Sequence, residues 1–178
     1  MSSTDRTEQL RLGFLTAVET REHAYVGGLL VTDRFGRPLE FQCTTPVKPN
    51  RTQELLYGPT LVPFILGELL GKTLVERIAV KPHLVFVDRL EMLALRPTCQ
   101  MPVLCSLERS KDDVPALEIV ELGKHRWLLH AEFTSDKEVL KKHTSFFAAD
   151  ADMREPLERV AEALKETMAA VSPQVRVA

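Results

Sequence analysis

The stretch Lys81-Pro82-His83-Leu84-Val85-Phe86-Val87-Asp88 decides the fold that this sequence predicts. Its apolar centre is short, uninterrupted and rich in β-branched and aromatic residues, and a proline introduces it. A run of this kind is typical of a strand that is buried on both faces of a sheet. Because a predicted helix precedes it, we expect this strand to join the sheet through a right-handed crossover.

Upstream of this strand, three segments carry strand patterns, namely residues 10–18, 24–32 and 39–43. The first and third alternate apolar and polar residues, whereas the second is apolar on both faces, as in a central strand. A turn at 33–37 separates the second from the third, and its Gly36 suits a positive φ. The sequence therefore predicts three sequential antiparallel strands.

Between these strands and residues 81–88, the sequence predicts a helical segment after a proline-stiffened loop at 44–50. Thr52 is the expected N-cap and Gly71 the expected left-handed stop. Two prolines inside the segment lack backbone donors and clash with the preceding turn. We therefore expect a kinked helix or two short helices here.

Downstream, the patterns predict more strands and two closing helices. A hairpin is expected around Gly123-Lys124, a pair that suits a type II′ turn. Both closing helices begin at a capping-box pattern, Ser135-x-x-Glu138 and Asp152-x-x-Glu155. The remaining expected elements are a short helix within 89–101, a strand at 103–107, and hairpin strands at 116–122 and 125–134.

Taken together, these elements predict an α/β fold, with α+β as the other reading. We expect a mostly antiparallel mixed sheet of five to seven strands with helices packed on it. The length of 178 residues predicts a single domain, which we place at 10–171. Residues 1–9 are expected to be a disordered tail and residues 172–178 a loose one.

Composition and charge restrict the function classes. The formal net charge is −2, from 23 Lys and Arg against 25 Asp and Glu, which is not the basic excess of nonspecific nucleic-acid binders. Neither a secretory signal nor a membrane-spanning run is found. Three cysteines without paired spacing predict reduced thiols and a cytoplasmic protein, and no cofactor motif is present.

Carboxylates form the most informative group of polar residues. Glu19 lies near the end of the first strand, Glu40 in the third, and Asp88 at the end of the strand that follows the crossover. The carboxyl ends of strands are the usual place for ligands in an α/β sheet. If they converge there, these three catalytic candidates could bind Mg²⁺, which prefers hard oxygen ligands and activates water.

The order of three strands, helix, strand, short helix and strand resembles the ribonuclease H-like fold, and a profilin- or longin-like layout is the runner-up. The segments 81–88 and 101–104 are similar in layout to endonuclease V. That resemblance implies a metal-binding carboxylate at Asp88. It also implies an Asp in the first strand, where this sequence offers Leu15, Ala17 and Glu19. The Gly expected after Asp88 is Arg89.

A second candidate surface lies in the proline-punctuated segment 45–63. Leu55, Tyr57 and Arg51 stand there on a backbone stiffened by turns, and this mixture suits a protein interface. A basic edge with an aromatic residue, able to stack on a nucleic acid, is also conceivable. Its residues would be Arg34, Phe35, Arg37, Lys48 and Arg51.

The first functional hypothesis is a non-catalytic intracellular interaction subunit of a larger assembly, with a protein partner or self-association and no cofactor. The alternative is a divergent Mg²⁺-dependent nuclease that uses Asp88 with Glu19 and Glu40. The sequence leaves a nucleic-acid partner open and predicts no membrane. The competing structural explanation is that Asp88 ends a strand and caps the next turn, while Glu40 faces solvent.

Overall fold

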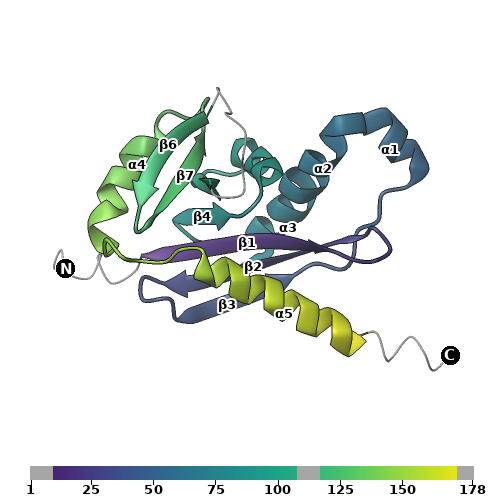
Figure 1. Cartoon of the computed structure of the whole chain (residues 1–178), viewed down its shortest axis with the longest axis horizontal. Coiled ribbons are helices and arrows are strands. Elements are labelled where there is room, and N and C mark those ends of the chain that lie inside the picture. The colour runs from purple at the N-terminus through teal and green to yellow at the C-terminus, as the bar shows by residue number, and fades with distance from the viewer. Residues whose placement is uncertain (1–9, 108–116, 172–178) are drawn as a thin grey trace.

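A computed structural model of the chain describes residues 10–107 and 117–171, which form a seven-stranded mixed sheet (Figure 1). The strand order is β3-β2-β1-β4-β5-β7-β6. Strands β4 and β5 run parallel to β1, and the other four neighbouring pairs are antiparallel. The strands are β1 (Arg11–Glu19), β2 (Tyr25–Asp33), β3 (Pro38–Cys43), β4 (Leu84–Val87), β5 (Val103–Ser106), β6 (Leu117–Leu122) and β7 (His125–His130).

The arrangement confirms the predicted α/β fold with a mostly antiparallel mixed sheet and the ribonuclease H-like strand order. Strand β4, whose four residues are all buried, inserts beside β1, so the chain crosses over between β3 and β4. That crossover joins parallel strands, which no tight turn can do, and it carries the helical segment expected between them. Residues 1–9, 108–116 and 172–178, including both predicted tails, lie outside the described residues.

The crossover segment is more broken than a single helix. It consists of α1 (Arg51–Tyr57), the 3₁₀ turn η1 (Gly58–Thr60), α2 (Leu61–Pro63), the π-helical η2 (Phe64–Gly71) and α3 (Lys72–Arg77). The kink expected from the two prolines is present. The two predicted ends are wrong, however. Asn50 is the N-cap in place of Thr52, because its side chain accepts from the Gln53 amide at 2.8 Å. Gly71 keeps a helical φ of −60°, so the helix continues.

The later helices follow their predictions in part. The segment after β4 is a 3₁₀ helix, η3 (Leu90–Thr98), with a proline near its end. Helix α4 (Asp136–His143) begins without a side-chain hydrogen bond from Ser135, so that predicted capping box is wrong. Helix α5 (Glu155–Val171) is capped as expected, since Asp152 Oδ1 accepts from the amides of Arg154 and Glu155.

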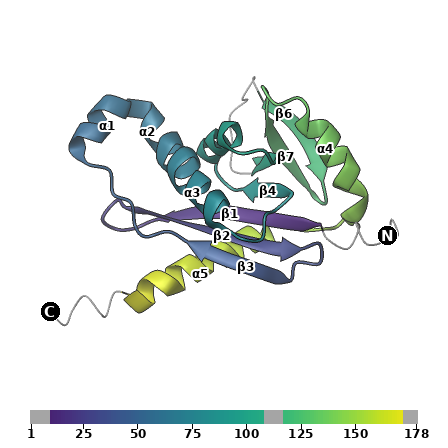
Figure 2. The same cartoon turned by 180° about the vertical axis from the view of Figure 1, so that it is seen from behind.

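Two apolar layers sandwich the sheet. On one face, η2, α3 and η3 pack on residues such as Leu15, Val85 and Val103. On the other face, α5 and α4 pack on residues such as Phe14, Phe86 and Trp127. Figures 1 and 2 show α5 on the side of the sheet opposite the crossover helices. Within the described residues, no helix is long and apolar enough to cross a membrane.

Candidate functional site

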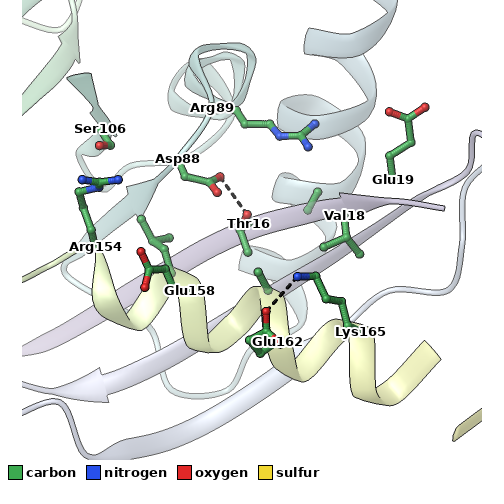
Figure 3. A pocket seen from close by; sticks show the side chains of 13 residues that line it. Thr16, Val18, Glu19, Asp88, Arg89, Ser106, Arg154, Glu158, Glu162 and Lys165 are labelled. Atoms are coloured by element: carbon green, nitrogen blue, oxygen red, sulfur yellow. Dashed lines mark hydrogen bonds and ion pairs between the residues drawn. The ribbon is translucent and has the colours of Figure 1, made fainter. Parts of the chain in front are cut away.

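A pocket of about 620 Å³ lies between helix α5 and the carboxyl ends of the three parallel strands (Figure 3). Thr16 to Glu19 of β1, Asp88 and Arg89 after β4, and Ser106 of β5 line its strand side. Its helix side is lined by α5 and by Arg154, which precedes that helix. This is the place where sheets with parallel strands usually hold ligands.

The register of the three strands sets a row of polar side chains across the pocket. Leu15 pairs with Val87, and Val87 pairs with Cys105. The next residue on each strand is therefore Thr16, Asp88 and Ser106 respectively, and successive side chains of a strand point to opposite faces. Because their apolar predecessors pack on the crossover helices, these three polar residues face α5.

A hydrogen bond joins the side chains of Thr16 and Asp88. The Thr16 hydroxyl, on a residue that is 1% exposed, donates to Asp88 Oδ1 at 2.9 Å. Of the β1 residues, Thr16 therefore stands beside Asp88, rather than Leu15, Ala17 or Glu19, which the sequence analysis considered. Asp88 itself lies at the carboxyl end of β4 and lines the pocket, which agrees with its predicted place in the sheet.

Glu19 lines the outer end of the same pocket but does not join Asp88. Figure 3 shows its carboxylate turned away from the Thr16–Asp88 pair. An exposed partner, His23 Nδ1, lies 2.9 Å from Glu19 Oε1. Since Leu15 and Ala17 pack on the crossover side of the sheet, strand alternation turns Glu19 to that side as well.

Glu40 lies on the other face of the sheet, so the structure does not bring it together with Asp88. Its carboxylate accepts from the backbone amides of Val80 at 2.7 Å and Ala79 at 3.2 Å. The Val80 amide, together with Gln42, lowers the pKa of Glu40 below its ordinary value. Glu40 therefore ties the edge strand β3 to the chain that leaves α3, rather than facing solvent freely.

Helix α5 supplies side chains that the sequence analysis did not single out. Glu158, Glu162 and Lys165 follow one another at spacings of three and four, so they share one face of the helix. Glu162 and Lys165 form an ion pair at 2.9 Å. Figure 3 shows the Glu158 side chain rising from α5 on the helix side of the pocket. The apolar periodicity of the sequence predicted this helix, but only the packing of α5 on the sheet shows which of its polar residues line the pocket.

The pocket contains carboxylate oxygens of the kind that Mg²⁺ binds, but the described residues do not form a complete metal site. Among the described residues, no group of three or more His, Cys, Asp or Glu side chains converges at metal-binding distance. Mg²⁺ is, however, usually held by one or two carboxylates, with water and substrate phosphate completing its coordination. Asp88 and Glu158 line the same pocket and supply two such carboxylates.

Cysteine chemistry does not contribute to this site. Cys105 immediately precedes Ser106 but points to the opposite layer, where burial raises the pKa of its thiol to about 12. Burial likewise raises the pKa of the Cys99 thiol to about 11. A nucleophilic thiol has to ionise near neutral pH, so both groups are unreactive at that pH.

The predicted protein interface maps to helix α1, which projects from the sheet (Figure 1). Leu55 is 66% exposed, Tyr57 stacks on Phe64 at 4.8 Å between ring centroids, and Arg51 bonds Glu54 at 3.2 Å. The predicted basic edge, in contrast, is split. Arg34, Phe35 and Arg37 lie at the β2–β3 turn, at the other end of these strands from Lys48 and Arg51.

Comparisons with known proteins support the fold. No protein-family model matches this chain, and no curated protein matches it either. Among solved structures, human ENDOV is similar with a TM-score of 0.53 at 10% identity, over 97% of this chain and 91% of that one. Endonuclease V of Ciona intestinalis, solved in complex with a 23mer DNA that contains an inosine followed by a ribo-adenosine, is also similar. Its TM-score is 0.53 at 10% identity, over 90% of this chain and 86% of that one. At such identities the likeness establishes a ribonuclease H-like fold and nothing further.

Proposed function

We propose that this protein is a divergent Mg²⁺-dependent nuclease that acts on a nucleic-acid strand held in the pocket between the parallel strand ends and α5. The observation that carries the proposal is the position of Asp88. It directly follows β4 in the pocket, accepts a hydrogen bond from the Thr16 hydroxyl, and lines the same pocket as Glu158. Solved endonuclease V structures with the same fold, including one with bound DNA, add support.

The residues of the pocket divide into two chemical roles. Asp88 and Glu158 would hold the metal, and the Thr16 hydroxyl keeps one oxygen of Asp88 in place. Mg²⁺, when bound, supplies a Lewis acid for a phosphoryl oxygen and lowers the pKa of a coordinated water. Arg89 and Arg154 line the same pocket and offer guanidinium groups, which suit the negative charge of a phosphodiester.

The proposal is tested by Asp88→Asn, which keeps the shape and removes the charge. Mg²⁺ and Mn²⁺ binding should be measured by calorimetry, and cleavage should be followed on labelled single- and double-stranded DNA and RNA. We expect the wild type to bind metal and cleave, and Asp88→Asn to lose cleavage by roughly 100-fold or more, because a metal ligand is removed.

Asp150→Asn is the matched control, since this exposed Asp makes the same charge change outside the pocket. It should behave as the wild type does. A wild-type protein that binds neither metal, or one whose cleavage survives in Asp88→Asn, would rule out the metal nuclease.

A protein-interaction function is the second candidate, and helix α1 favours it. Each of its seven residues is described and none is buried, with Leu56 80% exposed beside Leu55. So short a helix is marginal without tertiary support, and two adjacent exposed leucines are typical of a covered surface. Under this candidate the chain joins a partner or a second copy through Leu55, Tyr57 and Arg51.

Light scattering of the wild type and of Leu56→Lys tests this candidate. A dimer or larger mass that Leu56→Lys reduces to the monomer would support it. Ile119→Lys, at an exposed position on the distant strand β6, is the control and should leave the mass unchanged. A monomeric wild type would remove self-association.

A further inference from the structure

Ser106, at the end of β5, carries a buried hydroxyl that nothing in the described chain satisfies. The residue is 3% exposed, and its Oγ has no hydrogen-bond partner among residues 10–107 and 117–171. A buried donor left unpaired destabilises a folded protein, so such groups are rare and point to a missing partner. The same side chain lines the pocket, so a ligand that enters the pocket can become that partner.

Arg154 lies at the same end of the pocket. Figure 3 shows its guanidinium next to the Ser106 hydroxyl, while Glu19 and Lys165 lie toward the opposite end. The backbone of Arg154 is fixed where α5 begins, because its amide donates to Asp152 Oδ1 at 3.0 Å. Asp152 in turn contacts Lys124 Nζ at 2.7 Å and His125 Nε2 at 3.0 Å on the β6–β7 hairpin.

The lining of the pocket carries four carboxylates and three cationic side chains, so an anion binds there only where the carboxylates are offset. Glu162 is paired with Lys165, and Glu19 is held by His23 outside the centre of the pocket. Asp88 and Glu158 are the two groups to which the proposed function assigns the metal. The cationic and hydroxyl donors of Arg154 and Ser106 lie at one end of the pocket, where a phosphate can be placed beside that metal.

We propose that Ser106 and Arg154 form a phosphate subsite, in which both donate hydrogen bonds to nonbridging oxygens of one phosphodiester of the bound strand. A guanidinium presents several N–H groups in a planar fork that matches a phosphate, and a serine hydroxyl adds a further donor. This inference rests on the proposed nuclease function and names the chemical group that the site recognises. Because both donors belong to the chain, we expect phosphate binding without a metal as well, although it should be weaker while Asp88 and Glu158 keep their charges.

The test measures inorganic phosphate binding by NMR titration in EDTA, on the wild type, Ser106→Ala and Arg154→Gln. We expect each variant to bind phosphate roughly 10- to 100-fold more weakly, as befits a lost hydrogen bond to a charged group. Ser145→Ala and Arg77→Gln, at exposed positions outside the pocket, are the matched controls and should bind as the wild type does.

Thermal unfolding separates a binding role from a structural one. Because Ser106→Ala removes an unsatisfied buried donor, its Tm should be equal to or above that of the wild type while phosphate affinity falls. A lower Tm with unchanged phosphate affinity would show that the hydroxyl is structural and would overturn the subsite.

Two further measurements identify the source of the phosphate and distinguish the subsite from the proposed nuclease function. A short single-stranded oligonucleotide should displace inorganic phosphate from the wild type. If it fails to do so, the subsite serves a free phosphate compound and its assignment to nucleic acid is overturned. If the protein cleaves in a way that depends on Asp88 but binds no phosphate in EDTA, the subsite is ruled out and the nuclease proposal is kept. If phosphate binding depends on Ser106 and Arg154 but no cleavage is found, the nuclease proposal is ruled out and the phosphate site is kept.

Discussion

At the residue scale, the pairing of Thr16 with Asp88 is the main chemical departure from the pattern that the family resemblance implied. A hydroxyl beside Asp88 donates a hydrogen bond at 2.9 Å, whereas a second carboxylate there would repel it. The pair is therefore stable without a metal. Fewer carboxylates also mean that more of the coordination has to come from water and substrate phosphate.

The variant Thr16→Asp should make the stability of the protein depend on Mg²⁺. The new carboxylate would be buried next to Asp88, so we expect a loss of about 2–4 kcal/mol of unfolding free energy in EDTA. Millimolar Mg²⁺ should restore much of it, which a comparison of Tm with and without Mg²⁺ measures. Thr16→Val, which loses only the hydroxyl, should show no such Mg²⁺ response. An equal Tm of Thr16→Asp in both buffers would argue against metal binding at Asp88.

A second residue-scale prediction concerns a buried ion pair between η3 and α4. Arg96 Nε and Nη2 donate to the two carboxylate oxygens of Asp136 at 2.8 and 2.9 Å, and the side chains of Arg96 and Asp136 are 8% and 2% exposed. The Arg96 guanidinium also lies 3.9 Å from the centre of the Phe133 ring. Asp136→Ala leaves this guanidinium unpaired, so urea unfolding should show a loss of roughly 3–5 kcal/mol.

The double variant Arg96→Met with Asp136→Leu should recover most of that loss, since neither charge then remains buried. A double variant as unstable as Asp136→Ala would mean that packing, rather than the unpaired charge, determines the cost.

At the scale of elements, glycines decide how closely the helices approach the sheet and one another. A Cβ on Gly28 of β2 would meet Leu164 Cδ2 at 2.9 Å and Val160 Cγ1 at 3.0 Å, both on α5. A Cβ on Gly67 of η2 would meet Ala94 Cβ at 2.7 Å and the Leu95 backbone nitrogen at 2.8 Å. The atoms that a Cβ on Gly28 would meet belong to side chains, which can shift, whereas those near Gly67 include backbone atoms.

Gly67→Ala should therefore cost more than Gly28→Ala. We expect Gly67→Ala to lower the unfolding free energy by about 1–3 kcal/mol, because overpacking against backbone outweighs the helix propensity that alanine adds. Gly28→Ala should cost less and should disturb mainly α5, the helix that bears Glu158. Urea unfolding of both variants checks this order, and the reverse order would contradict it.

At the scale of the whole molecule, a histidine pair links the beginning of β1 to helix α4. Arg11 N–H donates to His83 Nδ1 at 3.0 Å, and the rings of His83 and His143 lie 5.9 Å apart. Burial, followed by the charge of Arg11 and the neighbouring His143, lowers the pKa of His83. Burial, followed by Lys142, lowers the pKa of His143.

Acid should therefore weaken the fold through these two residues. A lowered pKa in the folded state means that the unfolded chain binds more protons, so stability is present above the ordinary His pKa of about 6.5 and is lost as pH falls through the folded values. Urea unfolding between about pH 7.5 and about pH 5 should show this decline. His83→Asn keeps an acceptor for Arg11 N–H and should make the decline shallower. An unchanged slope would exclude His83 as its source.

Much of the fold was predictable because its signals are local. The buried run that became β4 and the turn at Gly36 each depend on neighbours within a few residues. The first strand was also found, but the alternation predicted for it is wrong, because six consecutive residues of β1 are buried. The capping of α5 by Asp152 is equally local, and it was predicted correctly. Ser135 carried the same pattern, but its backbone is helical, at φ −64° and ψ −19°, and its side chain makes no cap hydrogen bond.

By itself, the sequence determined the three sequential strands, the helical segment that follows them and the place of Asp88 after a buried strand, since hydrophobic period and turn chemistry act over short distances. Only the tertiary structure decided which residues stand beside Asp88. Register selects Thr16 rather than Leu15, Ala17 or Glu19, and it sends Glu40 to the opposite face. A shift of one residue turns every side chain of a strand to the other side of the sheet, and packing with distant partners fixes that choice. The same packing brings Glu158, Arg154 and Ser106 into one pocket from segments that share no local signal.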